Sequence, residues 1–161
     1  EAESVLQPDE FMNRKLHFKK AAIGKIDKQI DEGIRGDYIQ WIEPTTAPPG
    51  EQAYLQRLHE MISFLNQNLF LSLKDVEIHR TVYPLGTRYQ RHIDQFRADD
   101  HRKLSIICYL NADWKPEHGG QLRLHLPSGK QDFLPEQGRF VCFRSDEIEH
   151  EVLPAKREQQ R

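Results

Sequence analysis

The chain has 161 residues and a mass of 19.0 kDa, about the size of one ordinary domain, so folding can bury roughly two-thirds of the unfolded surface. A composition of 37% hydrophobic and 30% charged residues, with a mean hydropathy of -0.76, is typical of a soluble globular protein. No run reaches the ~20 apolar residues of a membrane span. A formal net charge of -2 and a pI near 6.5 argue against a nucleic-acid-binding protein. We therefore expect neither nucleic acid nor a membrane as a partner.

The two cysteines, Cys108 and Cys142, lie inside apolar stretches that are typical of strands. We expect both to be buried free thiols, as in a protein of a reducing compartment. A cytoplasmic location is the default expectation, although the chain begins at Glu1 rather than Met, which leaves a removed targeting segment open. The sequence sets no oligomeric state, and a monomer is compatible with it.

The first third of the chain is expected to be mainly helical. Apolar residues recur at helical spacing from about Phe11 to Asp31, and Gly33 follows just beyond the end. A second amphipathic helix is predicted from about Gln52 to Phe70, after a proline-rich loop over residues 43–50. Between the two helices, residues 37–42 alternate as a strand does.

The remainder of the chain is expected to form β-structure. Short runs of β-type residues, separated by turns rich in Pro and Gly, lie within residues 76–83, 88–96, 103–111, 120–126, 139–143 and 150–153. Regular short strands of this kind indicate a β-sandwich or jelly roll, here buttressed by the two helices. The predicted fold class is α+β, mainly β. We expect one domain over residues 1–161, with helical support to about residue 70 and a double-stranded β-helix (jelly-roll) core from about residue 71.

The first residues that indicate chemistry are His92 and Asp94. In a strand, side chains two residues apart project from the same face, so both can reach one metal ion. The motif is weak alone, because His-x-Asp occurs often by chance. His150 follows an apolar strand much further along the chain and supplies a second imidazole. Two imidazoles and one carboxylate form the facial set that holds non-haem Fe(II) and leaves positions open for substrate and oxygen.

The other histidines are expected not to be metal ligands. They lie on predicted helices, in predicted loops, or in strands without a carboxylate two residues away. These residues are His17, His59, His79, His101, His118 and His125.

Further motifs follow one another along most of the chain. They are Ile34–Ile42 (IRGDYIQWI), Tyr83-Pro84 with Gly86-Thr87 and the strand leading to Asp94, Tyr109-Leu110-Asn111 with Asp113-Trp114, Gly119-Gly120 with Leu122-Arg123, and Ser145-Asp146 leading to His150-Glu151-Val152 and Pro154-Ala155. This ordered series resembles the Fe(II)- and 2-oxoglutarate-dependent dioxygenases. Within them, it is similar to the prolyl hydroxylases related to the animal oxygen-sensing enzymes and their bacterial counterparts.

The resemblance implies a set of cofactors and residues that hold them. His92, Asp94 and His150 would ligate Fe(II), with 2-oxoglutarate and O2 as cosubstrates and ascorbate as a candidate reductant. Tyr109 would donate its hydroxyl to the distal carboxylate of 2-oxoglutarate, and Tyr83 would lie over the cofactor or substrate near the metal. No catalytic residue beyond the metal centre is expected.

The family also has a basic residue shortly after the second histidine, which pairs with the same distal carboxylate. Arg157 and Arg161 are the candidates here, and we favour Arg161, where the final strand of the family should begin. Because the chain stops at Arg161, that strand is expected to be missing. Either a C-terminal piece is left out or cofactor binding differs from the family.

The resemblance also implies a substrate. The segment from about Lys28 to Tyr38 would belong to a loop that closes over a protein substrate. Arg35, Asp37 and Arg91 are therefore candidate substrate-binding residues. The expected reaction is hydroxylation of a prolyl residue in a protein or peptide, with oxidative decarboxylation of 2-oxoglutarate to succinate and CO2.

Two alternatives use the same site. A zinc hydrolase could hold the metal with the same three ligands, but it needs a carboxylate base nearby. Glu149 and Glu151 flank His150 in a strand, so they should point away from the metal. A non-catalytic jelly-roll module that binds peptides is the other alternative, and the missing final strand favours it.

Overall fold

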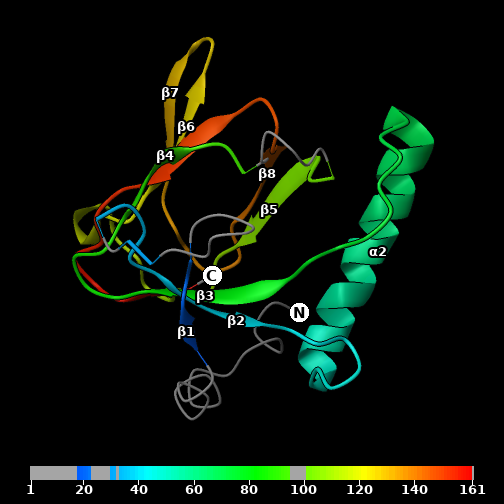
Figure 1. Cartoon of the computed structure of the whole chain (residues 1–161), viewed down its shortest axis with the longest axis horizontal. Coiled ribbons are helices and arrows are strands. Elements are labelled where there is room, and N and C mark those ends of the chain that lie inside the picture. Colours follow the sequence, from blue (N-terminus) through cyan, green and yellow to red (C-terminus); the bar gives the residue numbers. More distant parts are fainter. Residues whose placement is uncertain (1–17, 23–29, 32, 95–100, 161) are drawn as a thin grey trace. The chain divides into compact units, whose positions relative to one another are not determined.

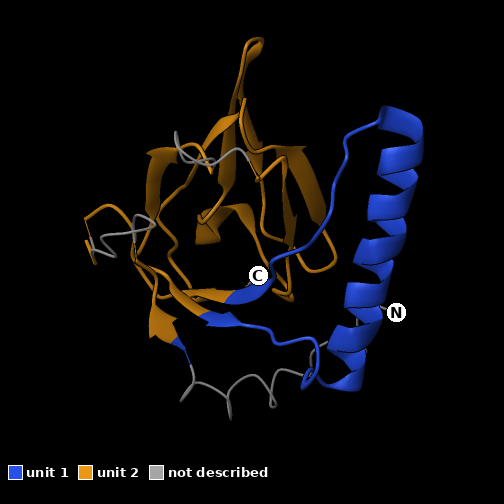
Figure 2. Cartoon of the chain, turned by 45° about the vertical axis from the view of Figure 1, so that its right-hand side comes forward, with its two compact units in different colours: residues 1–18, 40–80 blue, residues 19–39, 81–161 orange. Residues whose placement is uncertain are grey.

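The computed structural model describes residues 18–22, 30–31, 33–94 and 101–160. The chain divides into two compact units (Figure 2), of which the first comprises residues 1–18 and 40–80 and the second comprises residues 19–39 and 81–161. The single-domain organisation expected from the sequence stays a prediction. All described residues of the candidate metal site lie in the second unit.

The first unit contains helix α2, Pro49–Leu69 (Figure 1), which confirms the predicted second helix. Proline is favourable in its first turn, where a backbone N–H has no partner within the helix. Leu55 and Leu58 are its buried apolar residues, and the buried carboxylate of Glu51 pairs with Arg80. The helix is followed by the capping residue Phe70, whose backbone is left-handed with φ 53°. Among the described helices, none combines the length and apolarity needed to cross a bilayer.

One four-stranded sheet has the strand order β1-β2-β3-β10. β1 (Lys19–Lys20) pairs antiparallel with β2 (Tyr38–Trp41), and β10 (Gln159–Gln160) pairs antiparallel with β3 (His79–Tyr83). The predicted strands within residues 37–42 and 76–83 are confirmed. β10 lies where the sequence analysis contains no strand.

The prediction of one continuous helix from Phe11 to Asp31 is wrong where the structure describes that segment. Lys19 and Lys20 form β1, with Ile39 and Tyr38 as their partners. Residues 11–17 and 23–29 of the predicted helix lie outside the described residues. Helical spacing of a few apolar residues is a weak signal, and pairing with a distant strand outweighs it here.

The second unit contains two further antiparallel sheets. One has the order β4-β9-β6-β7, and the other pairs β5 with β8. Their bounds are β4 Tyr89–His92, β5 Leu104–Cys108, β6 Leu122–Leu126, β7 Gly129–Phe133, β8 Phe140–Arg144 and β9 Glu149–Val152. The sequence predicts each of them except β7, which is polar and mostly exposed and therefore lacks an apolar alternation. A short 3₁₀ turn, Pro116–His118, precedes β6.

An apolar cluster from β6, β8 and the residue after β5 forms the core of this unit. Its buried members are Tyr109, Leu122, Leu124, Val141 and Phe143. Alternate residues of each strand point into it, while their neighbours Arg123 and His125 belong to the opposite face. The described residues thus form a mainly β fold of antiparallel sheets with one helix.

The cysteines are less buried than the sequence predicts. Neither cysteine of the described residues forms a disulfide, but Cys108 is half-buried and Cys142 is exposed. In β8, Val141 and Phe143 are the buried residues, so Cys142 between them points to the other side. An apolar run gives no indication of which of its residues face out, so it predicts more burial than the structure shows.

Gly119 is expected to tolerate no side chain. Its φ is +69°, and a Cβ there would lie 2.5 Å from the carbonyl oxygen of Pro154. We expect Gly119→Ala to lower the free energy of unfolding by about 2–5 kcal/mol, from the left-handed backbone and the clash together. Gly138 is the matched control, because its φ is +76° but nothing lies within 4 Å of an added Cβ. Gly138→Ala should cost only about 1–2 kcal/mol in urea denaturation, and equal losses would contradict the steric argument.

Candidate metal centre

The structure brings His92, Asp94 and His150 together. His92 is the last residue of β4, and it lies opposite His150 of β9 in the antiparallel register. Nε2 of His92 lies 3.4 Å from Oδ1 of Asp94, and Nε2 of His150 lies 3.5 Å from Oδ2. One donor atom from each of the three residues lies within 4.8 Å of the others. Two strands far apart in the sequence, and the bend that follows the first of them, therefore bring their donor atoms to one point.

An irregularity in β4 determines where His92 points. Tyr89 pairs with Val152 and His92 pairs with His150, so three steps along β4 match two steps along β9. One extra residue in a strand is typical of a β-bulge, which bends the strand and re-aims its side chains. Strict alternation would put Tyr89 and His92 on opposite faces, but their rings stack with centroids 3.6 Å apart and planes 19° apart.

Backbone carbonyls orient both imidazole rings. Nδ1 of His92 lies 2.6 Å from the carbonyl oxygen of Gln90, and Nδ1 of His150 lies 3.2 Å from that of Ile148. A carbonyl oxygen can only accept a hydrogen bond, so each Nδ1 carries the proton and each neutral ring has its lone pair on Nε2. Histidines that bind metals are commonly oriented in this way. Both rings are thus arranged to bind a metal ion through Nε2.

The carboxyl group of Asp94 supplies the negative charge of the site. Burial alone would raise its pKa, but the neighbouring imidazoles of His92 and His150, when they are protonated, and a hydrogen bond from Ser105 hold the pKa well below its usual range. The group is therefore an ionised carboxylate at neutral pH, and both of its oxygens can donate an electron pair to a metal ion. Two imidazole lone pairs and one carboxylate suit Fe(II) and leave other coordination positions open, so the donor set fits this metal.

Aromatic and apolar groups surround the histidines. His150 is only 4% exposed, and the Phe143 ring contacts it edge-on with centroids 4.7 Å apart. Phe143 belongs to the same apolar cluster as Tyr109. A metal ion held here would therefore lie beside a wall that excludes water on the side of β8.

The two predicted cofactor-binding tyrosines are fully buried. Tyr109 and Tyr83 are both 0% exposed. Tyr109 lies in the cluster that contacts His150, directly after β5, and Ile107 packs against the same cluster. Tyr83 is the last residue of β3 and pairs in register with Gln159 of β10.

Arg35 and Asp37, predicted to bind substrate, pair with each other. Nε of Arg35 donates to Oδ1 of Asp37 at 2.7 Å and Nη2 donates to Oδ2 at 2.9 Å. Burial alone would lower the pKa of Arg35, but the hydrogen bonds and charge of Asp37 raise it above its ordinary value. The guanidinium of Arg35 also lies over the Tyr89 ring, 4.6 Å from its centroid. Contacts therefore lead from Asp37 through Arg35 and Tyr89 to His92.

This pair lines a pocket of about 280 Å³ in the second unit. Its wall consists of Lys20, Gly33, Arg35, Gly36, Asp37, Tyr38, Pro84, Gly86, Thr87 and Arg88. Three of these residues carry a positive charge and one a negative charge. The pocket therefore favours polar or anionic groups on any ligand that enters it.

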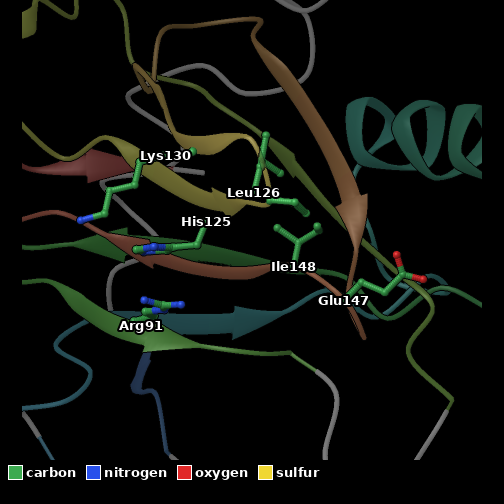
Figure 3. Close-up of a pocket in the computed structure, with 8 residues that line it drawn as sticks. Arg91, His125, Leu126, Lys130, Glu147 and Ile148 are labelled. Carbon is green, nitrogen blue, oxygen red and sulfur yellow. The ribbon is translucent and has the colours of Figure 1, made fainter.

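The structure does not bring Arg91 to the triad. Arg91 forms an ion pair with Glu149, which directly precedes His150 in β9 and so points to the opposite face of the sheet. On that face, Arg91, His125 and Lys130 gather at one end of a pocket of about 440 Å³, and Glu147 lies at the other end (Figure 3). Arg91 therefore lines a different surface from Arg35 and Asp37.

Of the two candidate C-terminal arginines, the structure describes one. The guanidinium of Arg157 is exposed and lies over the Trp114 ring, 5.8 Å from its centroid. Arg161 lies outside the described residues, as do residues 95–100 of the loop after the metal-binding strand.

The remaining described histidines have other surroundings. His59 bonds to the Leu55 carbonyl within α2, His118 accepts a hydrogen bond from the Lys115 backbone, and His125 pairs with Glu151. His79 packs edge-on against Trp41, and His101 lies in a loop. His17 lies outside the described residues. Among the described residues, His92, Asp94 and His150 are the one group that could hold a metal ion.

Tyr89, Ser105 and Ser145 all contribute to the site, although no sequence motif predicts a role for them. Tyr89 stacks on His92, and the two serines form hydrogen bonds that end on Asp94. Alternation in β5 could have pointed to Ser105, since it shares a strand face with Ile107 and precedes Tyr109 on that face. The position of Tyr89 depends on the bulge, for which the sequence carries no signal.

Comparisons with known proteins agree with this site. The profile of the 2OG-Fe(II) oxygenase superfamily matches residues 78–161. Human Egl nine homolog 1 is 34% identical over 132 residues, which cover 76% of this chain and 30% of that protein. The chain thus spans about a third of the length of the curated relatives it matches.

Solved structures extend the similarity to nearly the whole chain. A prolyl-4-hydroxylase from Pseudomonas putida is 39% identical with a TM-score of 0.88, covering 99% of this chain and 81% of that one. A Trichoplax adhaerens prolyl hydroxylase, solved in complex with a hypoxia inducible factor oxygen degradation domain peptide fragment, is 27% identical with a TM-score of 0.84, covering 99% of this chain and 74% of that one. From its sequence profile, its fold and its His-Asp-His centre, the chain belongs to the 2OG-Fe(II) oxygenase superfamily.

Proposed function

We propose that the chain is a Fe(II)- and 2-oxoglutarate-dependent dioxygenase that hydroxylates a prolyl residue in a protein or peptide. The observation that carries this proposal is the convergence of His92, Asp94 and His150 with both Nε2 lone pairs available. Fe(II) bound there would activate O2. One oxygen atom would be used to oxidise 2-oxoglutarate to succinate and CO2, and the other would convert a substrate C–H bond to C–OH. The similarity to the Pseudomonas putida prolyl-4-hydroxylase supports proline as the acceptor.

We further propose that Tyr109 and Arg161 bind the distal carboxylate of 2-oxoglutarate and that Tyr83 lines the same cavity. Full burial of both tyrosines supports this role, because a phenol in an apolar wall offers one hydroxyl in a place from which water is excluded. The contact of Arg157 with Trp114 favours Arg161 over Arg157. The proposed frame for these residues is a jelly roll in which the sheets β4-β9-β6-β7 and β5-β8 lie on either side of the core cluster.

Tyr109→Phe tests the cosubstrate site. The variant keeps the ring that packs in the core cluster and removes only the hydroxyl. Because a hydrogen bond to a charged group is lost, we expect the KM for 2-oxoglutarate to rise about 10- to 100-fold in steady-state turnover. Tyr54→Phe on α2, a half-buried tyrosine of the first unit, is the matched control and should leave that KM unchanged. An unchanged KM in Tyr109→Phe would remove Tyr109 from the proposal.

The proposed substrate groove is the pocket that contains Arg35. Asp37 is almost fully buried and already accepts both guanidinium hydrogen bonds, so we assign it the role of holding Arg35 rather than touching substrate. Arg35 in turn lies over Tyr89, which stacks on His92, so a peptide in this pocket would lie near the metal centre. Arg91 lines the opposite face, so we leave it out of the proposed groove. Ascorbate as reductant stays an expectation from the family resemblance, and a cytoplasmic location stays the default expectation.

The zinc hydrolase alternative gains no support. It needs a carboxylate base beside the metal, but Glu149 pairs with Arg91 and Glu151 pairs with His125 on the opposite face of the sheet. Asp94 itself is one of the three proposed ligands. No observation favours a non-catalytic module over an enzyme.

Product analysis tests the proposed reaction. The chain is incubated in air with Fe(II), 2-oxoglutarate and a library of proline-containing peptides, and the products are analysed by mass spectrometry and succinate assay. We expect one oxygen atom to be added at proline, with one succinate formed for each hydroxylated peptide. Matched peptides with alanine in place of proline should not be hydroxylated. Hydroxylation only at other residues would overturn the choice of proline.

A further inference from the structure

Two serine hydroxyls, those of Ser145 and Ser105, form a hydrogen-bonded relay that ends on the Asp94 carboxylate. Oγ of Ser105 donates a hydrogen bond to Oδ2 of Asp94 at 2.5 Å, and it lies 2.8 Å from Oγ of Ser145. Ser145 is 0% exposed, so its hydroxyl is fully removed from water. The proposed function uses neither serine.

The chemistry of the three groups determines which group donates each hydrogen bond of the relay. An ionised carboxylate has no proton, so Ser105 must be the donor to Asp94. A serine hydroxyl has only one proton, so Ser145 must be the donor to Ser105. Each hydrogen bond polarises the next one, which strengthens the bond to the carboxylate.

Both serines are anchored by the β5-β8 sheet rather than by β4, the strand that precedes Asp94. Ser105 lies opposite Phe143 in the register of that sheet, and the backbone N–H of Ser145 donates to the Lys103 carbonyl at 3.1 Å. Asp94 lies two residues beyond the end of β4, where no ladder hydrogen bond holds it among the described residues. The hydroxyl of Ser105 therefore ties this carboxylate to a paired strand.

We propose that Ser105 and Ser145 are positioning residues that make Asp94 bind the metal through Oδ1 alone. The inference rests on the proposed metal site. A hydroxyl proton on Oδ2 withdraws electron density from that oxygen, so Oδ1 becomes the better donor. A carboxylate bound through one oxygen keeps open a coordination position that binding through both oxygens would fill. Ser145 acts only through Ser105, by fixing the direction of its hydroxyl.

Mn(II) affinity of the full chain, measured by EPR titration, tests the relay without turnover. We expect Ser105→Ala to weaken Mn(II) binding about 10- to 100-fold, as loss of a group that orients a metal ligand does. Ser145→Ala should weaken it about two- to tenfold, through loss of one neutral hydrogen bond. The double variant should be no weaker than Ser105→Ala, because both changes remove the same path. Ser105→Thr keeps the hydroxyl on a residue suited to a strand and should restore most of the affinity.

Two further measurements separate the relay from a general structural effect. Ser128→Ala, in the exposed turn between β6 and β7, should leave Mn(II) affinity unchanged. The visible spectrum of the Co(II)-loaded protein reports coordination number, and it should change in Ser105→Ala but not in Ser105→Thr. If Ser105→Ala does not fold, the Mn(II) affinities of Ser145→Ala and Ser105→Thr are compared instead. Both variants keep a hydroxyl donor to Asp94, but only Ser145→Ala shortens the relay.

The outcomes distinguish the relay from the metal site itself. Wild-type Mn(II) binding together with unchanged affinity in Ser105→Ala would overturn the relay and leave the proposed function standing. Losses in the single variants that add in the double variant would also overturn it, since Ser145 would then act by another path. A wild-type chain that binds no Mn(II) would overturn the proposed metal site and the relay together.

Discussion

Replacing His150 with alanine is expected to weaken metal binding by more than about 100-fold and to abolish turnover of 2-oxoglutarate. Loss of a group that only orients a ligand already lowers metal affinity or activity about 10- to 100-fold. His150 supplies one of three donor atoms, and it is nearly fully buried, so water cannot easily take its place. Removing it also leaves the Asp94 carboxylate with one imidazole instead of two. Metal titration followed by a turnover assay with Fe(II) measures both effects.

His125 is the matched control for this experiment. It lies on β6, the strand next to β9, but on the opposite face of the sheet, where its Nε2 lies 3.0 Å from Oε1 of Glu151. His125→Ala should therefore keep the metal affinity and turnover of the wild type. Equal losses in His125→Ala and His150→Ala would show that a general effect on the sheet, rather than loss of a ligand, explains the result.

Removal of Asp37 is expected to lower the free energy of unfolding by about 3–5 kcal/mol, the usual cost of leaving one charge of a buried ion pair without its partner. The Asp37 side chain is 0% exposed and that of Arg35 is 16% exposed. Asp37→Ala would leave the mostly buried guanidinium of Arg35 without its two hydrogen bonds. Denaturation in urea, with the wild type and variant measured side by side, gives the difference.

The surface pair of Arg123 and Asp132 is a control with the same geometry. It has two hydrogen bonds of 2.7 Å, but its side chains are 27% and 39% exposed. Asp132→Ala should cost less than about 1 kcal/mol, because water screens an exposed pair. The double variant Arg35→Ala with Asp37→Ala should recover part of the loss, since no uncompensated charge remains. Similar losses in Asp37→Ala and Asp132→Ala would contradict the argument from burial.

Much of the metal centre follows from local spacing and a family resemblance. A spacing of two in a strand predicts that His92 and Asp94 can share a metal ion, and the structure brings them together with His150. The predicted strand is too long, however, because β4 ends at His92 and Asp94 lies in a bend beyond it. The same alternation rule predicts that Arg91, directly before His92, faces the other way, as its pair with Glu149 indicates. The resemblance suggested Arg91 as a substrate residue, but the geometry of the strand favours Arg35.

Other features depend on partners that the sequence does not reveal. The stacking of Tyr89 on His92 requires a bulge, and the bulge exists only in the register between β4 and β9. Lys19 and Lys20 pair with β2 rather than extending a helix, because long-range pairing outweighs weak helical spacing. The serine relay joins the start of β5 to the residue after β8, which the antiparallel register brings to the same end of the pair, so neither serine could be identified from its own neighbours in the sequence.

The most direct test of the central claim is an anaerobic visible absorption spectrum of the chain with Fe(II) and 2-oxoglutarate. We predict a charge-transfer band that requires both components and is absent in His92→Ala. Arg161→Ala should shift the 2-oxoglutarate titration to higher concentration, whereas Arg157→Ala should not. A wild-type chain that binds Fe(II) without forming the band would contradict a chelated cosubstrate at the His92, Asp94 and His150 centre.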